Sequence, residues 1–390
     1  MQVALLASRS FGCEITGLHL PSALADGELS EPLLRAFLEA FNRHGLVVLR
    51  GQQGLRPEHE AAIYRQLGRY WTNRADINAE PNEAGPGGFS EIGVIGQEEF
   101  DAQMKMGSKS HEYDNMEWHT DGPTAVGRIA VCQYLACYSS PSECPSGELR
   151  WPAQDGEDER EHVLRFPAGS TLFASGYDAY ERSTEAEQQK MLALQARYSR
   201  GWGSLTNSGG GSDSDEDEDD IVVERDSEDG FSSAPVMDGS GTRRLQKPWY
   251  ANDEDNAARF NCVLPLVLRH PQTGRHSVLC EPIAMVQLEP LAPGDGSDAL
   301  SWDESHDLVS RAWRRATVPD RVLVWDWSPG DAIFWDSRCI LHSRTPYMLY
   351  APDESEESGG VGIRGERLMH NMRISVDLDE AGVLARSARL

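Results

Sequence analysis

Two short motifs, one in the first third of the chain and one near its end, most constrain the fold. The first is Trp118-His119-Thr120-Asp121, and the second is the segment WDSRCILH that ends at His342. Residues i and i+2 of an extended segment point to the same side, so His119 and Asp121 can hold one ion while Thr120 points away. Two imidazoles and one carboxylate form the facial triad that holds non-haem Fe(II) and leaves positions open for oxygen. The fold must therefore bring two segments that are distant in sequence side by side.

A His-x-Asp pair is weak evidence by itself, because a chain with eleven histidines and many acidic residues produces such pairs by chance. The alternative is a polar turn before a strand. The remaining sequence therefore has to decide between these two interpretations.

Hydrophobic periodicity predicts helices early in the chain and mainly short strands later. Helices are expected over residues 31–44, 57–67, 184–197 and 305–315, and strands over 46–49, 129–138, 170–174, 263–268, 277–279, 322–327, 332–335 and 368–376. This order favours a mainly β fold with flanking helices. A double-stranded β-helix, the jelly-roll core of cupin-like proteins, gathers ligands from non-adjacent strands as the triad requires. A doubly wound α/β fold is disfavoured, since no glycine-rich phosphate loop joins a strand to a helix.

Acidic charge is concentrated in one segment. The net charge is −27, and residues 212–230 hold eleven acidic residues and one arginine between glycine-rich flanks. Such a segment cannot bury enough apolar surface to offset its chain entropy. We predict a disordered acidic insertion at about 203–246 and a smaller acidic loop at 351–363, within one domain that spans 1–390. The rest lacks the basic stripe of a nucleic-acid-binding protein.

The cysteines and the hydropathy pattern indicate the cellular environment. Seven cysteines without a Cys-x-x-Cys pair favour neither a disulfide framework nor a zinc ribbon. No apolar stretch reaches membrane-spanning length, and the first residues lack the pattern of a secretory signal. We expect a reducing compartment, the cytoplasm or an organelle, and no membrane partner. The sequence does not indicate an oligomeric state.

Further segments occur in an informative order and spacing. They are GCEITG at 12–17, FNRHGLVVLRG at 41–51, STLFAS at 170–175, PLVLRHPQTGR at 265–275, WSPGD at 327–331 and RLMH at 367–370. With the two opening motifs, and over most of the chain from about Phe11 to Val376, they resemble the TauD/TfdA (taurine dioxygenase) family. Members of that family are Fe(II)- and 2-oxoglutarate-dependent dioxygenases with a jelly-roll core.

The resemblance implies a reaction and a set of cofactor contacts. O2 would hydroxylate a small-molecule substrate while 2-oxoglutarate is converted to succinate and CO2. Fe(II) would be held by His119, Asp121 and His342. The distal carboxylate of 2-oxoglutarate would be bound by Arg367, whose planar cation suits a carboxylate, and by the Thr171 hydroxyl. Arg364 is a rival for the cofactor role, because the acidic loop before it is longer than usual in the family.

The resemblance also marks three residues that would face the substrate. Asn115 matches a substrate-contacting position of the taurine-oxidising members. Asn371 stands four residues after the cofactor arginine, where the family usually has a second arginine that meets an anionic substrate. Arg373 lies on the same strand face as Arg367 by period-2 counting and could replace that cation. We therefore expect a small carboxylate or a polar neutral substrate, and poor use of taurine.

Two other functions remain open from the residues. A cupin-like hydrolase or isomerase could use the same triad with Zn(II), but a cofactor arginine such as Arg367 would then have no purpose. A catalytically idle jelly roll could act as an interaction module through its acidic segment, but such a protein has no need for all three metal ligands.

Overall fold

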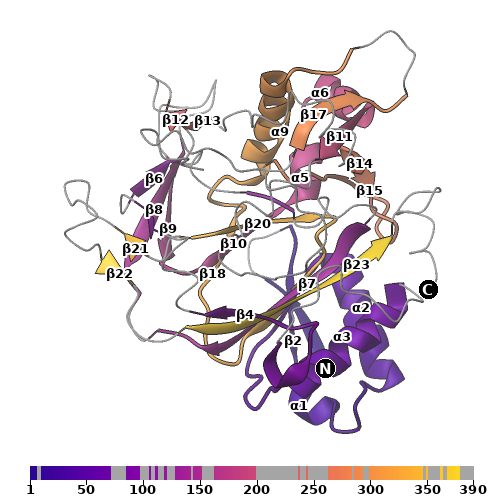
Figure 1. Ribbon diagram of the computed structural model, residues 1–390, viewed down its shortest axis with the longest axis vertical. Coiled ribbons are helices and arrows are strands. Elements are labelled where there is room, and N and C mark those ends of the chain that lie inside the picture. Colours follow the sequence, from indigo (N-terminus) through magenta and orange to yellow (C-terminus); the bar gives the residue numbers. More distant parts are fainter. Residues whose placement is uncertain are drawn as a thin grey trace, which may run out of the picture.

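Two β-sheets form the centre of the molecule, and helices pack on the outside (Figure 1). The computed structural model of the 390-residue chain describes residues 1–6, 10–71, 85–96, 105–106, 110–112, 118–120, 128–141, 144–151, 162–198, 236–237, 243–244, 262–282, 285–292, 298–345, 348–349, 361–362 and 367–377.

The larger sheet has seven strands, and all neighbouring pairs in it are antiparallel except β2 and β3. In spatial order they are β1 (Gln2–Leu5), β2 (Cys13–Thr16), β3 (Leu46–Leu49), β19 (Ala332–Trp335), β7 (Arg128–Ser139), β23 (Leu368–Asp377) and β4 (Gly93–Gly96). Strands from the two ends of the sequence therefore alternate in one sheet. The late strands β19 and β23 lie on either side of β7.

The smaller sheet consists of β18 (Leu323–Trp325), β10 (Thr171–Ser175) and β20 (Ile340–Arg344), with β10 in the middle. Side chains of both sheets meet in one buried apolar cluster. Phe173 and Trp325 enter it from the smaller sheet, and Ile333, Trp335 and Met369 enter it from the larger one. This layer is the interior of the predicted jelly roll.

Helices α2 (Glu31–His44) and α3 (Pro57–Trp71) cover the face of the larger sheet that lies away from the smaller one (Figure 1). The ring of Phe37 on α2 packs edge-on against Phe334 of β19, with centroids 5.1 Å apart. Pro32 at the first turn starts α2, and Gly45 ends it with a φ of 71°, where an added Cβ would lie 3.0 Å from the Cys339 sulfur. The short α1 (Leu20–Ala23) precedes them.

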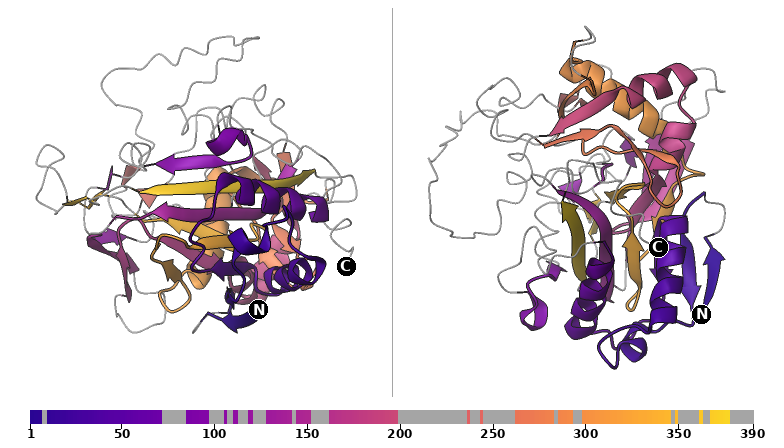
Figure 2. Two further views of the ribbon diagram at one scale, coloured as in Figure 1. Left: turned by 90° about the horizontal axis from the view of Figure 1, so that it is seen from below. Right: turned by 90° about the vertical axis from the view of Figure 1, so that its right-hand side faces the viewer.

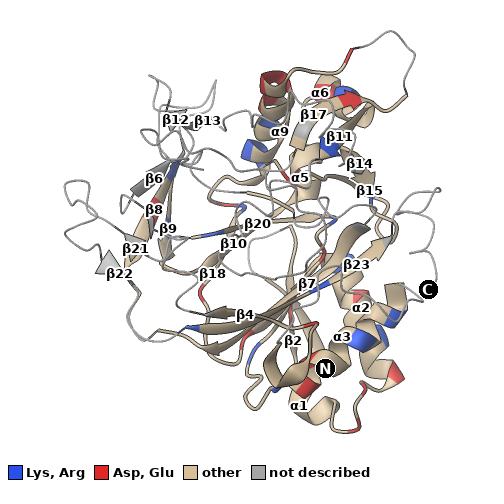
Figure 3. Cartoon of the chain, in the orientation of Figure 1, with Lys and Arg blue, Asp and Glu red and all other residues tan. Residues whose placement is uncertain are grey.

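A second unit of sheet and helices lies at the opposite end of the molecule from α1–α3 (Figures 1 and 2). Its elements are β11 (Leu194–Tyr198), β14 (Cys262–Pro265), β17 (Met285–Pro290), α5 (Gly176–Glu181), α6 (Glu185–Leu192) and α9 (Trp302–Ala316). Acidic residues occupy the first turn of α9 and arginines its last turn, as the helix dipole favours (Figure 3). A hairpin of β15 (Val267–Arg269) and β16 (His276–Val278) packs against α5.

The predicted helix over 184–197 is wrong in its second half. The capping box of Thr184 and Glu187 does start α6, but the helix ends at Leu192 and β11 follows. Leu194, Ala196 and Tyr198 are buried with period 2, because β11 lies between β14 and β17. Burial on a pleated sheet thus overrides the helical propensity of the segment LQAR.

The remaining described elements are short. They are η1 (Pro86–Gly88), β5 (Lys105–Met106), β6 (Ser110–Glu112), β8 (Ser146–Trp151), β9 (His162–Pro167), β12 (Val236–Met237), β13 (Arg243–Arg244), β21 (Met348–Leu349) and β22 (Val361–Gly362). The acidic residues 212–230 and most of the predicted loop 351–363 lie outside the described residues, while β12 and β13, inside the predicted insertion, pair with each other. Among the helices of the described residues, none has the length and apolarity needed to cross a membrane.

Candidate functional site

The segments that carry His119 and His342 lie side by side. The two residues form an isolated antiparallel bridge, in which each backbone N–H donates to the other residue's carbonyl at 3.0 Å. Their imidazole rings lie 4.1 Å apart between centroids, tilted by 49°. The structure thus brings together two of the three predicted metal ligands. The third, Asp121, lies outside the described residues.

The donor set of this site suits a divalent transition metal. Imidazole nitrogens bind iron, zinc and copper readily, and both histidines are only partly buried. Aromatic rings form part of the surroundings: the Trp335 and Phe173 centroids lie 5.2 and 6.4 Å from that of His342. An apolar shell of this kind limits water access and strengthens electrostatic interactions at a metal. The described residues of the site therefore fit the ion that the sequence motifs predict.

Thr120, between the two predicted ligands, points away from the site as expected for an extended segment. Its side chain is completely buried, and its backbone N–H and hydroxyl both donate to the carbonyl of Cys280, at 3.1 and 2.7 Å. The backbone at His119 is consequently fixed on both sides, by His342 and by Cys280. Sequence reasoning predicted the direction of Thr120 but missed this anchor.

Thr171, one of the two predicted 2-oxoglutarate ligands, is hydrogen-bonded to Trp327, and Arg367, the other, lies where β23 begins to pair with β7. The Trp327 indole N–H donates to the Thr171 hydroxyl at 2.9 Å, and the Ser140 hydroxyl donates to the Trp327 carbonyl at 3.0 Å. Ser140 directly follows β7, and Arg367 directly precedes β23 at the point where β23 pairs with the end of β7. Arg364, the rival arginine, lies outside the described residues.

Arg367 is buried, with 5% of its surface exposed. Burial lowers its pKa to about 10, and the neighbouring Cys137 and Cys144 oppose this shift weakly. The guanidinium therefore remains charged at neutral pH in a low-dielectric environment. A buried, planar cation of this kind is suited to a carboxylate, with which it forms short charge-assisted hydrogen bonds.

Strand β23 alternates between two environments. Met369 belongs to the apolar cluster between the sheets, whereas Met372 and Ile374 belong to the core beneath the helices. Arg367, Asn371 and Arg373 share the side of Met369 by period 2. Asn371 is exposed and Arg373 is partly buried, while Asn115, the third predicted substrate contact, lies outside the described residues.

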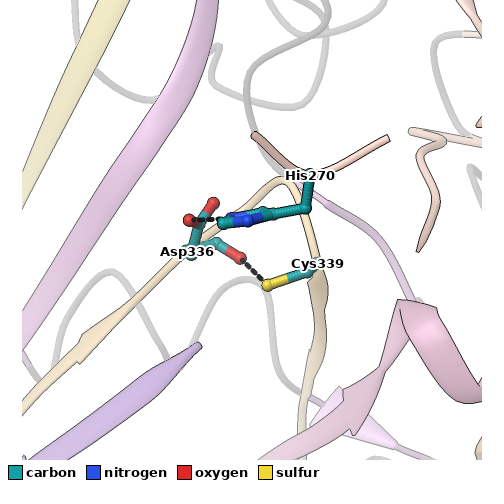
Figure 4. A group of neighbouring side chains, drawn as sticks. All are labelled: His270, Asp336 and Cys339. Atoms are coloured by element: carbon teal, nitrogen blue, oxygen red, sulfur yellow. Dashed lines mark hydrogen bonds and ion pairs between the residues drawn. The ribbon is translucent and has the colours of Figure 1, made fainter. Parts of the chain in front are cut away.

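A buried ion-pair network of Asp336, Arg338 and His270, in which sequence reasoning found no role, lies at the turn between β19 and β20. Figure 4 shows its Asp336 and His270 side chains. Asp336 accepts hydrogen bonds from Arg338 Nε at 2.9 Å and Nη2 at 2.6 Å, and from His270 Nε2 at 2.9 Å. All three side chains are at most 1% exposed. Burial would raise the pKa of Asp336, but Arg338 and His270 hold it well below its usual range. The only available sequence signal was the Asp-x-Arg spacing after a buried strand.

This network does not have the properties of a second metal site. Ligand atoms of His270, Asp336 and Cys339 lie within 4.8 Å of one another, which is close enough for one ion. However, the Arg338 guanidinium already bonds both carboxylate oxygens of Asp336, and it would repel a cation. Burial also raises the pKa of the Cys339 thiol, which therefore stays protonated. The charges of Asp336 and Arg338 cancel, and the His270 imidazole that supports this ion pair is uncharged.

Comparison with known proteins agrees with the fold and gives the family. The family model "Taurine catabolism dioxygenase TauD, TfdA family" matches residues 16–359. Pentalenolactone F synthase of Streptomyces avermitilis is 21% identical over 89% of this chain and 90% of its own length. The alpha-ketoglutarate-dependent xanthine dioxygenase xanA of Emericella nidulans is 26% identical over 85% of this chain and 87% of its own.

A solved structure shows the same fold. The crystal structure of AAD-2 in complex with Mn(II) and N-oxalylglycine has a TM-score of 0.54 at 16% identity, and the match covers 96% of this chain and 98% of that one. The paired sheets and the match over nearly all of the chain lead to one assignment. The chain belongs to the TauD, TfdA family of 2-oxoglutarate-dependent dioxygenases and has the family's jelly-roll fold.

Proposed function

We propose that this chain is an Fe(II)- and 2-oxoglutarate-dependent dioxygenase that hydroxylates a small-molecule substrate with O2 and releases succinate and CO2. The observation that carries the proposal is the bridge between His119 and His342, which joins two histidines from distant segments of the chain. An interaction module that acts through its acidic segment has no use for this arrangement.

In this proposal each functional residue has one task. His119 and His342, together with Asp121, hold Fe(II). When bound, Fe(II) and 2-oxoglutarate supply the activation of O2. Arg367 binds the distal carboxylate of 2-oxoglutarate, and the Thr171 hydroxyl, oriented by Trp327, assists it. The aromatic side chains around His342 exclude water from the reacting atoms.

The substrate is proposed to be a small carboxylate or a polar neutral molecule. Asn371, exposed on the Arg367 side of β23, offers only neutral donors and one acceptor. Arg373 is the one further described cation on that side of β23, and Asn115 is proposed as an additional contact. Taurine should therefore be a poor substrate. Efficient sulfite release from taurine would contradict this part of the proposal.

The proposed location is the cytoplasm or an organelle. Six cysteines in the described part of the chain are free thiols, and five of them are buried, which suits a reducing environment. Small-molecule substrate and O2 are the proposed partners.

The proposal is tested by succinate release with Fe(II), ascorbate and a panel of small anions, betaines and purines. His119→Ala should abolish metal-dependent turnover, because it removes a ligand. His19→Ala is the matched control, since His19 is exposed, bonds to the Ser22 hydroxyl and the Gln53 carbonyl, and is not among the predicted ligands. A His119→Ala protein that still binds iron and 2-oxoglutarate like the parent, in an anaerobic titration, would show that the metal site is wrongly assigned.

A further inference from the structure

We propose that the hairpin of residues 266–280, here called the clamp hairpin, sets the separation between the two metal-binding histidines. This inference rests on the proposed function. In it, Thr120 and His270 are positioning residues: neither touches the metal, but each ties one histidine-bearing segment to the same hairpin.

The first tie is at the downstream end of the clamp hairpin. The Cys280 carbonyl accepts both the backbone N–H and the hydroxyl of Thr120, at 3.1 and 2.7 Å. A two-point attachment fixes both the position and the rotation of the backbone at Thr120. Because His119 precedes Thr120 directly, this attachment determines where the His119 side chain begins.

The second tie is at the turn of the clamp hairpin. His270 Nδ1 accepts the backbone N–H of Thr273 at 3.4 Å, so Nε2 carries the proton and donates to Asp336 at 2.9 Å. The Asp336 carbonyl in turn accepts the backbone N–H groups of Cys339 and of Ile340, the first residue of β20. The strand that carries His342 therefore begins at a turn that His270 holds.

The hairpin between these two ties is stiff. β15 and β16 pair over three residues each, and the backbone N–H of Leu279 donates to the carbonyl of Leu266. Gly176, where β10 passes into α5, packs so closely on β16 that an added Cβ would lie 2.3 Å from the Ser277 hydroxyl oxygen. The hairpin thus has little freedom to move relative to β10, the strand that pairs with β20.

The consequence is that one rigid element is attached to both histidine-bearing segments. Without Thr120's hydroxyl, the His119 segment would keep its bridge to His342 but gain rotational freedom. Partners outside the ligand shell that orient metal ligands typically change metal affinity by roughly ten- to a hundredfold. We expect metal affinity to fall by about tenfold, near the lower end of this range. The reason is that a variant of the Thr120 side chain keeps the backbone hydrogen bond from Thr120 to Cys280.

The test uses Mn(II) as a probe, so that it does not depend on turnover. Mn(II) affinity of the full chain is measured by electron paramagnetic resonance titration for the parent, Thr120→Val and Thr120→Ser. Thr120→Val should weaken Mn(II) binding about tenfold, and Thr120→Ser, which keeps the hydroxyl, should restore most of it. His270→Leu should weaken Mn(II) binding as well. His270→Gln, which keeps a hydrogen-bond donor toward Asp336, should weaken Mn(II) binding less than His270→Leu does.

Thr317→Val is the matched control. The Thr317 hydroxyl is also buried and also donates to a backbone carbonyl, that of Trp313 at 2.8 Å, but it lies at the end of α9. Thr317→Val should lower the melting temperature about as much as Thr120→Val does, while leaving the Mn(II) affinity unchanged. Equal Mn(II) affinity in the parent and Thr120→Val would overturn the clamp inference alone. A parent that binds no Mn(II) would overturn the proposed metal site and this inference with it.

Discussion

Replacing Arg338 by Met tests the buried network most directly. The Arg338 side chain is completely buried, and two of its nitrogens donate to Asp336. Met preserves most of the apolar stem but removes the charge, leaving Asp336 with His270 and one backbone N–H as donors. Removing one partner of a buried ion pair typically costs about 3–5 kcal/mol, because the other charge stays buried without compensation. We expect a loss of that size in the free energy of unfolding at neutral pH.

The stability difference between the parent and Arg338→Met should also depend on pH, in a direction that follows from the pKa of Asp336. In the parent, the folded-state pKa of Asp336 is lowered, so its contribution to stability is fully present above the unfolded pKa of about 3.9 and is lost only as the pH falls further. In Arg338→Met, burial should raise that pKa above the unfolded value. The variant can then take up a proton in the folded state, and the stability difference between variant and parent should shrink on acidification.

Urea unfolding at neutral and mildly acidic pH measures both effects. Arg35→Met is the control, since Arg35 bonds Glu31 on the exposed side of α2 and solvent screens that pair. Adding Asp336→Asn to Arg338→Met should recover part of the lost stability. A loss below about 1 kcal/mol, the range of exposed pairs, or a difference that grows at acidic pH, would refute the reasoning.

Three further predictions concern the site and the chain around it. Arg367→Ala should raise the half-saturating 2-oxoglutarate concentration roughly ten- to a hundredfold, since a charged bidentate contact contributes on the order of 1.5–3 kcal/mol; the same effect in Arg364→Ala instead would assign the cofactor to that arginine. Exchanging residues 212–230 for a short Gly/Ser linker should leave the melting temperature and 2-oxoglutarate decarboxylation nearly unchanged, and a large fall would show that the segment packs. In native protein, Cys144 should be alkylated before Cys13, Cys132, Cys137, Cys280 and Cys339, as mass spectrometry of peptides can show. Burial raises the pKa of all six thiols, but only Cys144 is partly exposed to the reagent, whereas the other five are buried.

Local signals in the sequence were sufficient for several elements of the fold. The helix over 31–44 has the predicted bounds, because a proline in its first turn and a glycine after its last turn leave little choice. The buried strand 46–49 and the strand 332–335 are also confirmed. The pairing of these two strands could not be predicted from local signals. Phe334 lies opposite Val47, which is far away in the sequence, and no local periodicity encodes that register.

The same distinction holds for the site. The residue types and the i, i+2 spacing pointed to His119 and Asp121, and His342 was predicted to join them from a distant segment. The structure places His119 and His342 in one bridge, while Asp121 lies outside the described residues. The network around Asp336 could not be found in this way, because its members come from two distant turns and each looks like an ordinary turn residue. A carboxylate followed by Arg at i+2 is common on protein surfaces. Only burial in the tertiary structure makes these two residues an ion pair whose disruption strongly affects stability.

The position of β23 has a consequence for how the chain folds during synthesis. This strand is the last described element, yet it lies inside the larger sheet, with β7 on one side and β4 on the other. Until it leaves the ribosome, one side of the long β7 presents unpaired backbone groups, and such an edge invites pairing with other chains. The larger sheet therefore stays incomplete until β23 has been synthesised. The pairing of β23 with β7 is then a slow, non-local step. Chaperone protection should matter most in that interval. Translation that stops before residue 367 should yield an aggregation-prone product that also lacks Arg367, the arginine proposed to bind 2-oxoglutarate.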